Sequence, residues 1–106
     1  MVRSFQHGAL PRARLSRSRS RTSHGQVKPQ LESQDGRASP FILFIAVLYR
    51  SQVVSGTNYL IKVRCGYGAK DYAHLLVFEA LPVSGGQAVL QGYQLGRTRS
   101  DPLTPW

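Results

Sequence analysis

The side chains that could support covalent chemistry are one cysteine and three histidines, Cys65, His7, His24 and His74. A short connection separates Cys65 from His74, so a thiol and its base could in principle pair. No third group and no oxyanion-hole motif accompanies them. His7 and His24 lie in a segment expected to be disordered, and His74 falls in the middle of a predicted strand, where we expect a surface histidine on the solvent face. The sequence therefore predicts no enzyme and no catalytic residue.

Phosphate and metal chemistry have equally little support. The segment Gly66-Tyr67-Gly68 lacks the downstream glycine and the Lys-Ser/Thr pair that a phosphate loop requires, and is more typical of a hairpin turn. The five acidic residues are scattered, and one cysteine cannot form a cysteine-rich zinc site. We therefore expect neither a cofactor nor a metal.

The net charge of +9 is concentrated in the first 25 residues. Six arginines and no acid stand there, which gives +6, whereas residues 26–106 carry eight basic and five acidic residues, which gives +3. The run Ser16 to Arg21 alternates serine and arginine. It has three interpretations: a solvated tail, an arm that attracts phosphate backbones until its serines are phosphorylated, or an import sequence, although Gly8 and Pro11 interrupt an amphipathic helix.

Composition sets the size and class of the fold. The 106 residues, 11.8 kDa, support one small domain, and 42% apolar against 18% charged residues is typical of a chain that folds. The longest apolar run, Phe41 to Tyr49, has nine residues, against the roughly 20 that a membrane-spanning helix needs. A single cysteine excludes an intrachain disulfide and favours a reducing compartment.

The elements that must position any site follow from periodicity. Val27 and Leu31 share one helix face, which predicts helical character over Gln26 to Ser33. Pro29 leaves two alternatives, a short helix that starts near Lys28 or a longer helix that is kinked. Alternating apolar residues and glycine-rich turns predict four strands, which pair antiparallel and bury a single face under the helix. The fold class is α+β. The strands are expected at Phe41 to Val54, Asn58 to Arg64, Tyr72 to Leu81 and Ala88 to Leu95.

The residues from Gln52 onward carry a more specific pattern. Gln52-Val53-Val54-Ser55-Gly56-Thr57-Asn58-Tyr59 resembles the Gln-Val-Val-Ala-Gly-Thr-Asn-Tyr hairpin of the cystatins, and within them of the stefins, the type 1 group. Further segments resemble the stefins in the same order, the stefin A branch above all, and the resemblance covers about Gln26 to Trp106. These segments are Val27-Lys28-Pro29-Gln30-Leu31-Glu32, Ile61-Lys62-Val63-Arg64, His74-Leu75, Val77-Phe78, Leu81-Pro82, Gly92-Tyr93-Gln94, and Asp101 with Leu103-Thr104.

The resemblance implies a fold and a function. It implies a cystatin-like antiparallel sheet of four to five strands wrapped on one helix, and a wedge that reversibly and non-covalently occludes the active-site cleft of papain-like cysteine proteases such as cathepsins L, S, H and B. It also implies a cytoplasmic monomer that can exchange strands into a domain-swapped dimer. The residues that it assigns to the wedge are Gly8 in an N-terminal trunk, Gln52, Val53, Val54, Ser55 and Gly56 in a first hairpin, and Leu81 and Pro82 in a second.

Two departures from the family pattern shape the remaining expectations. Residues 17–25 are polar where stefins continue the helix, so we expect a shortened helix and divide the chain into a disordered arm, 1–25, and a stefin-like domain, 26–106. Ile45, Leu48 and Leu76 replace polar positions, which predicts an apolar patch on the sheet. The alternative function is a non-inhibitory binding module whose Arg/Ser arm contacts RNA or acidic partners; nucleic acid is otherwise not expected, nor is a membrane.

Overall fold

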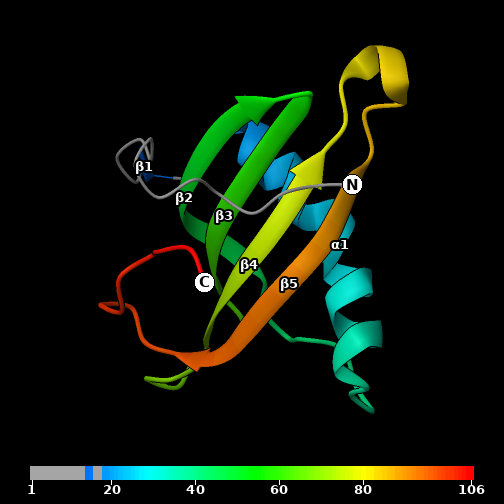
Figure 1. Cartoon of the computed structure of the whole chain (residues 1–106). Coiled ribbons are helices and arrows are strands. Elements are labelled where there is room, and N and C mark those ends of the chain that lie inside the picture. Colours follow the sequence, from blue (N-terminus) through cyan, green and yellow to red (C-terminus); the bar gives the residue numbers. More distant parts are fainter. Residues whose placement is uncertain (1–13, 16–17) are drawn as a thin grey trace.

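The computed structural model describes the backbone of Arg14–Leu15 and of residues 18–106, with side chains from Gly25 onward. Within these residues the structure has one α-helix, a short 3-10 helix and a five-stranded antiparallel sheet with the spatial order β1-β2-β3-β4-β5 (Figure 1). The predicted α+β class is therefore confirmed. The elements are β1 (Arg14–Leu15), α1 (Ser18–Asp35), β2 (Ile45–Val54), β3 (Gly56–Arg64), β4 (Tyr72–Glu79), the 3-10 helix η2 (Pro82–Ser84) and β5 (Ala88–Arg97).

The main core lies between α1 and the inner face of the sheet. Alternate residues of a strand point to the same face, so the odd-numbered positions of β3 and β4 meet the helix. Among the α1 side chains that the structure describes, from Gly25 onward, Val27 and Leu31 are buried, as their spacing predicted. The strand residues packed around them are Tyr59, Ile61, Val63, Ala73, Leu75, Val77, Ala88 and Leu90.

The helix is longer than the sequence predicted. It begins at Ser18, eight residues before the expected start at Gln26, and contains Pro29 in its interior. Of the two alternatives that Pro29 left open, the longer helix is the one observed. The expectation of a shortened helix was wrong because it required each turn to bury apolar side chains, whereas helical hydrogen bonds are local and each added residue contributes one. The end of the predicted arm, residue 25, therefore falls inside α1. Residues 1–13 and 16–17, Gly8 among them, lie outside the described residues.

The outer face of the sheet is also covered, which corrects the prediction of a single buried face. The segment after β5, residues 98–106, folds back so that Leu103 is buried against Leu60 of β3. Leu48 and Leu76 pack against this pair. Of the three residues expected to form an exposed apolar patch, only Ile45 is exposed.

Lys62 and His74 lie under the same C-terminal segment. The Lys62 ammonium donates to the backbone carbonyls of Arg99 and Asp101, both at 2.6 Å, which fixes the segment to β3. His74 is the cross-strand partner of Lys62 and only 2% of it is exposed. The expectation of a surface histidine was wrong. Residues 98–106 bury His74, and their sequence has no periodic pattern that would predict packing on the sheet.

Two glutamines of α1 close the edge of the sheet at β5. Gln26 accepts a hydrogen bond from the backbone N–H of Ala88, and Gln30 accepts one from Leu90 and donates one to the Ala88 carbonyl, at 2.8 to 2.9 Å. An edge strand otherwise presents unpaired backbone groups that can recruit another chain. The helix thus packs against β5 in the core and also satisfies backbone groups at the edge of that strand.

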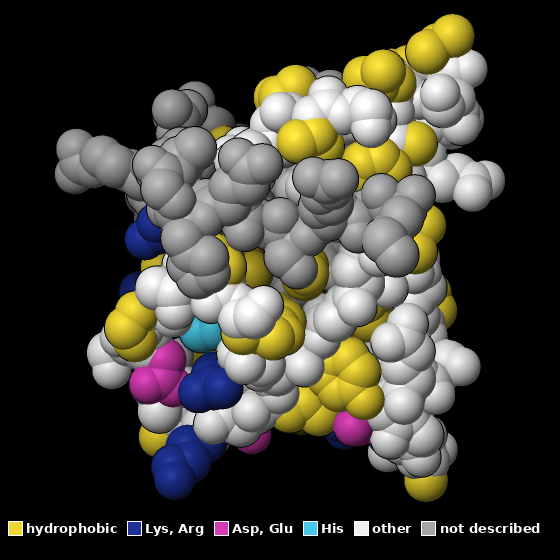
Figure 2. Space-filling model, viewed as in Figure 1, with side chains coloured by type: hydrophobic (Ala, Val, Ile, Leu, Met, Phe, Trp, Pro, Cys, Tyr) yellow, Lys and Arg dark blue, Asp and Glu magenta, His cyan; other side chains and the backbone are white. Residues whose placement is uncertain are grey.

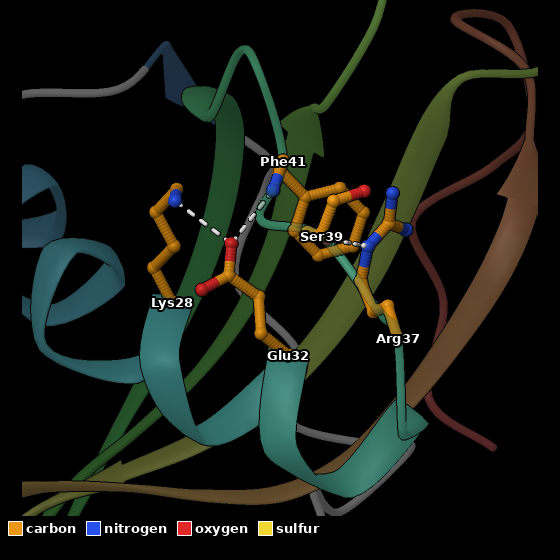
Figure 3. A network of polar contacts seen from close by, with 5 residues as sticks. All are labelled: Lys28, Glu32, Arg37, Ser39 and Phe41. Atoms are coloured by element: carbon orange, nitrogen blue, oxygen red, sulfur yellow. Dashed lines mark hydrogen bonds and ion pairs between the residues drawn. The ribbon is translucent and has the colours of Figure 1, made fainter.

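A polar network joins the end of α1 to the start of β2 (Figure 3). One carboxylate oxygen of Glu32 accepts hydrogen bonds from the Lys28 ammonium at 2.8 Å and the Phe41 backbone N–H at 2.7 Å. These two donors, Lys28 first, lower the pKa of Glu32 below its usual value. The Arg37 guanidinium stacks over the Phe41 ring, 3.7 Å from its centroid, and this fixes the connection between helix and sheet.

Candidate functional site

The first predicted hairpin joins β2 to β3 through a single turn residue. Val54 pairs with Gly56 across the hairpin, Val53 with Thr57 and Gln52 with Asn58, so Ser55 alone forms the tip. Val53 is 78% exposed and Val54 and Ser55 are also exposed, while Gln52 is half-buried. Aliphatic side chains displayed at a tight turn expose apolar surface that a partner could bury.

Gly56 has a structural role that the sequence did not reveal. Its φ of +139° lies where side chains rarely fit, and a Cβ built on it would lie 2.6 Å from both the Glu79 carbonyl oxygen and Cζ of Phe78. Gly56 is buried, so its small size permits the turn to rest on β4. A larger side chain at Gly56 would therefore disturb the turn itself.

The second predicted element is the connection between β4 and β5. Leu81 and Pro82 are exposed and lead into η2, whose backbone is closed by hydrogen bonds from Ser84 and Gly86 to the Leu81 carbonyl, at 2.8 and 3.0 Å. Proline fixes φ at the first position of this turn. The backbone of the loop is thus held in one compact shape.

Val83 belongs to this surface although the sequence analysis did not select it. At 89% exposed it is the most exposed large apolar residue among those the structure describes. One feature of the sequence could have identified Val83. It is an aliphatic residue in a turn, directly after Leu81-Pro82, where no alternating pattern predicts burial.

The sheet brings the two elements to one end of the molecule. Thr57 pairs with Glu79, and Glu79 pairs with Ala88. The β2–β3 turn and the β4–β5 connection therefore lie at the same end of the strands. Figure 1 shows both at the top, with the β4–β5 connection extending beyond the strands. Hydrophobic side chains are visible over this end in Figure 2. Of the predicted site residues, only Gly8 lies outside the described part of the chain.

The surface formed by residues 52–56 and 81–83, here called the hairpin surface, carries no charged side chain. Its exposed apolar members are Val53, Val54, Leu81 and Val83. Such a surface gains free energy by burial, at about 25 cal/mol per Å² of apolar area, and its preformed turns lose little conformational entropy on binding. The properties of the hairpin surface favour non-covalent association.

The structure separates the two residues that could have formed a nucleophile and base. Cys65 packs against the inner core while His74 belongs to the outer face of β4, so the sheet lies between them. The thiol of Cys65 donates to the Asp71 carbonyl at 3.3 Å, and burial raises its pKa. A thiol with a raised pKa is a poor nucleophile at neutral pH. Within the described residues, no three His, Cys, Asp or Glu side chains form a group that could hold a metal ion.

Among residues the structure describes, no helix is long and apolar enough to cross a bilayer.

Comparison with known proteins identifies the family. A model of the cystatin domain matches residues 24–100. Leukocyte cysteine proteinase inhibitor 1 of Sus scrofa is 46% identical over 79 residues, which are 74% of this chain and 73% of that protein. Stefin-C of Bos taurus and cystatin-A of Homo sapiens are each 46% identical over 79 residues, covering 74% of this chain and 74% and 76% of those proteins. With the hairpin surface, the α+β sheet and these similarities together, the chain belongs to the cystatin family, in its type 1 or stefin group.

Proposed function

We propose that this protein is a reversible inhibitor of papain-like cysteine proteases and that the hairpin surface enters the protease's active-site cleft. The observation that carries the proposal is that Val53, Val54, Leu81, Pro82 and Val83 lie exposed on two turns at one end of a rigid sheet. The names of the relatives support it, since one of them is called a cysteine proteinase inhibitor. No catalytic residue is assigned, so the protein is not an enzyme in this proposal.

The mechanism follows from the shape of the two turns. A protease cleaves a segment that lies extended through its cleft with a carbonyl carbon against the nucleophile. Val54 and Gly56 are instead paired with one another across a one-residue turn. The hairpin therefore fills space without offering an extended scissile bond, and dissociates unchanged. Because the hairpin surface carries no charged side chain, its contribution to inhibition should depend little on salt.

Three finer parts of the proposal rest on the resemblance alone. Gly8 is assigned to an N-terminal trunk that adds a third contact with the protease. Cathepsins L, S, H and B are the expected targets, in the cytoplasm. The protein acts as a monomer and can form a domain-swapped dimer.

Titration of papain with the purified full chain tests the main proposal. We expect saturable loss of peptidase activity at micromolar inhibitor or below, regained on dilution. Val53→Asp and Leu81→Asp should each weaken inhibition at least tenfold, because a carboxylate must then be desolvated in the cleft.

Ile42→Asp is the matched control. Ile42 is also 78% exposed and aliphatic, but it precedes β2 at the opposite end of the sheet, where Ile45 pairs with Arg64. It should inhibit as the unmodified chain does. Full activity of papain at micromolar protein, or equal weakening by Ile42→Asp and Val53→Asp, would contradict the proposal.

A further inference from the structure

A second concave surface lies at the opposite end of the sheet from the hairpin surface. It is an open groove of about 770 Å³ between the β3–β4 turn and the turn after β5. The side chains that matter along its walls are Arg64, Tyr67, Tyr72, Thr98, Arg99 and Ser100. Volumes of 300 to 1,000 Å³ are common for small-molecule sites. The groove is thus large enough for a mononucleotide.

The groove has an excess of positive charge. Arg64 and Arg99 line it, and two carboxylates stand beside it, since Asp71 and Asp101 accept hydrogen bonds from the backbone N–H groups of the lining residues Gly68 and Thr98. Arg97 stands next to it, because its cross-strand partner Tyr72 and its neighbour Thr98 are both lining residues. In Figure 2 basic and acidic side chains lie side by side at this lower end of the molecule. Paired arginines favour a phosphate group, whose oxygens accept two parallel hydrogen bonds from a guanidinium.

The arginines are only partly used within the fold. The Nε of Arg64 donates to the Gly66 carbonyl at 3.0 Å, and the backbone carbonyl of Arg99, not its side chain, accepts from Lys62. The Nε of Arg97 is buried with no hydrogen-bond partner among the described residues. Arg97 does not line the groove and its charge acts on the Asp101 carboxylate, so the charges available to an anion in the groove are those of Arg64 and Arg99.

An aromatic ring stands at the rim of the same groove. Tyr67 is 72% exposed, and the Arg64 guanidinium lies over its ring, 5.5 Å from the centroid. Stacking of a base on an aromatic side chain contributes about 1–3 kcal/mol in nucleic-acid binding. The hydroxyls of Thr98 and Ser100 supply further hydrogen-bonding groups.

From this arrangement we propose that the groove binds a mononucleotide, with its phosphate between Arg64 and Arg99 and its base on Tyr67. Because the groove and the hairpin surface lie at opposite ends of the sheet, both can be occupied at once. Nucleotide binding is thus separable from protease inhibition, and failure of one leaves the other untouched.

The test is a titration of the full chain with adenosine monophosphate, followed by amide chemical shifts in NMR spectra at fixed salt. We expect a dissociation constant on the order of 0.1–1 mM, since the groove is open, with shifts at Arg64–Asp71 and Thr98–Asp101. Adenosine, which lacks the phosphate, and inorganic phosphate, which lacks the ring, should each bind at least tenfold more weakly.

Matched variants separate this site from general charge attraction. Arg99→Ala should weaken binding at least tenfold with an unchanged melting temperature, since only the backbone of Arg99 is used in the fold. Lys28→Ala removes one positive charge from α1, outside the groove, and should change affinity less than twofold. Equal losses in the two variants, equal binding of phosphate or adenosine, or shifts outside the groove would each overturn the proposal.

Discussion

Single buried polar residues determine how this protein responds to acid. His74 packs beside the Lys62 ammonium and near Arg97, with Asp101 as the one facing carboxylate, and its Nε2 is buried without a hydrogen-bond partner among the described residues. Burial first, then the charges of Lys62 and Arg97, lowers the pKa of His74 from 6.5 to about 4. The neutral imidazole is therefore the form that the fold requires.

We predict that the free energy of unfolding decreases as the pH falls from about 6.5 to 4. Because the pKa of His74 is lower in the folded state, the unfolded chain binds the proton first, and a contribution on the order of 2–3 kcal/mol is lost in this window. Urea unfolding at pH 7 and pH 4.5 measures it. His74→Leu removes the titrating group, so its loss of stability over this range should be smaller; equal losses would contradict the assignment.

Gly56 provides a second prediction for a single residue. Gly56→Ala should destabilise the fold by roughly 2 kcal/mol or more, because the positive φ and the contact with the Glu79 carbonyl both oppose a methyl group. A thermal melt measures the effect. Ser55→Ala at the adjacent exposed position should melt within a few degrees of the unmodified chain. If Gly56→Ala melts at the same temperature as Ser55→Ala, the close packing of this turn on β4 is refuted.

At the scale of elements, the side chains of α1 hold the edge of the sheet. Gln30→Ala removes two hydrogen bonds to β5, one to each of Ala88 and Leu90. We expect a loss of about 1–3 kcal/mol, because the backbone N–H of Leu90 is left without its partner. Chemical denaturation monitored by circular dichroism measures this loss.

Gln34→Ala is the control for that change. Gln34 is an exposed glutamine on the same helix, and only its backbone carbonyl accepts a hydrogen bond, from the Tyr93 hydroxyl. Its replacement should be neutral or slightly stabilising, because alanine favours helix. Equal destabilisation by the two substitutions would show that helix content, and not the β5 contact, is responsible.

The sequence predicted strands more accurately than it predicted the helix, for a physical reason. Alternation of apolar residues located β3 and β4 to within two residues of their ends, because a strand with one face in a core must alternate. The first turns of α1 carry no apolar residue that could mark them. Strand periodicity also could not show that residues 98–106 cover the outer face, so Lys62 and His74 were expected at the surface.

At the scale of the whole molecule, the C-terminal segment is a second layer on the sheet. Leu103→Ala would leave a cavity over Leu60, Leu48 and Leu76, and we expect a loss of about 2–4 kcal/mol of stability. Increased binding of a hydrophobic dye and a lower melting temperature measure the change. Trp106→Ala, at an exposed position at the end of the segment, should cost less; an equal cost would show that the segment does not depend on Leu103.

The candidate site was partly accessible from the sequence. Spacing and turn residues located both turns of the hairpin surface, and the resemblance to the stefins suggested their common purpose. The exposure of Val83 and the close packing of Gly56 could not be predicted from the sequence. Both depend on the three-dimensional arrangement of the turns, and for Gly56 on how β4 passes beneath the first hairpin. The groove beside Tyr67 was missed for the same reason, since Arg64 and Arg99 are 35 positions apart in the chain and meet only through strand register.

The contact between Gly56 and the Phe78 ring mechanically couples the two hairpins. The first turn lies close to Phe78 of β4, the strand that leads directly into Leu81 and Pro82, so we expect the two tips to move together. A target enzyme would thus contact one rigid surface rather than two turns that move independently. Mutations beneath the tips, at positions no bound enzyme would touch, should then shorten the lifetime of a complex as effectively as changes at the tips themselves.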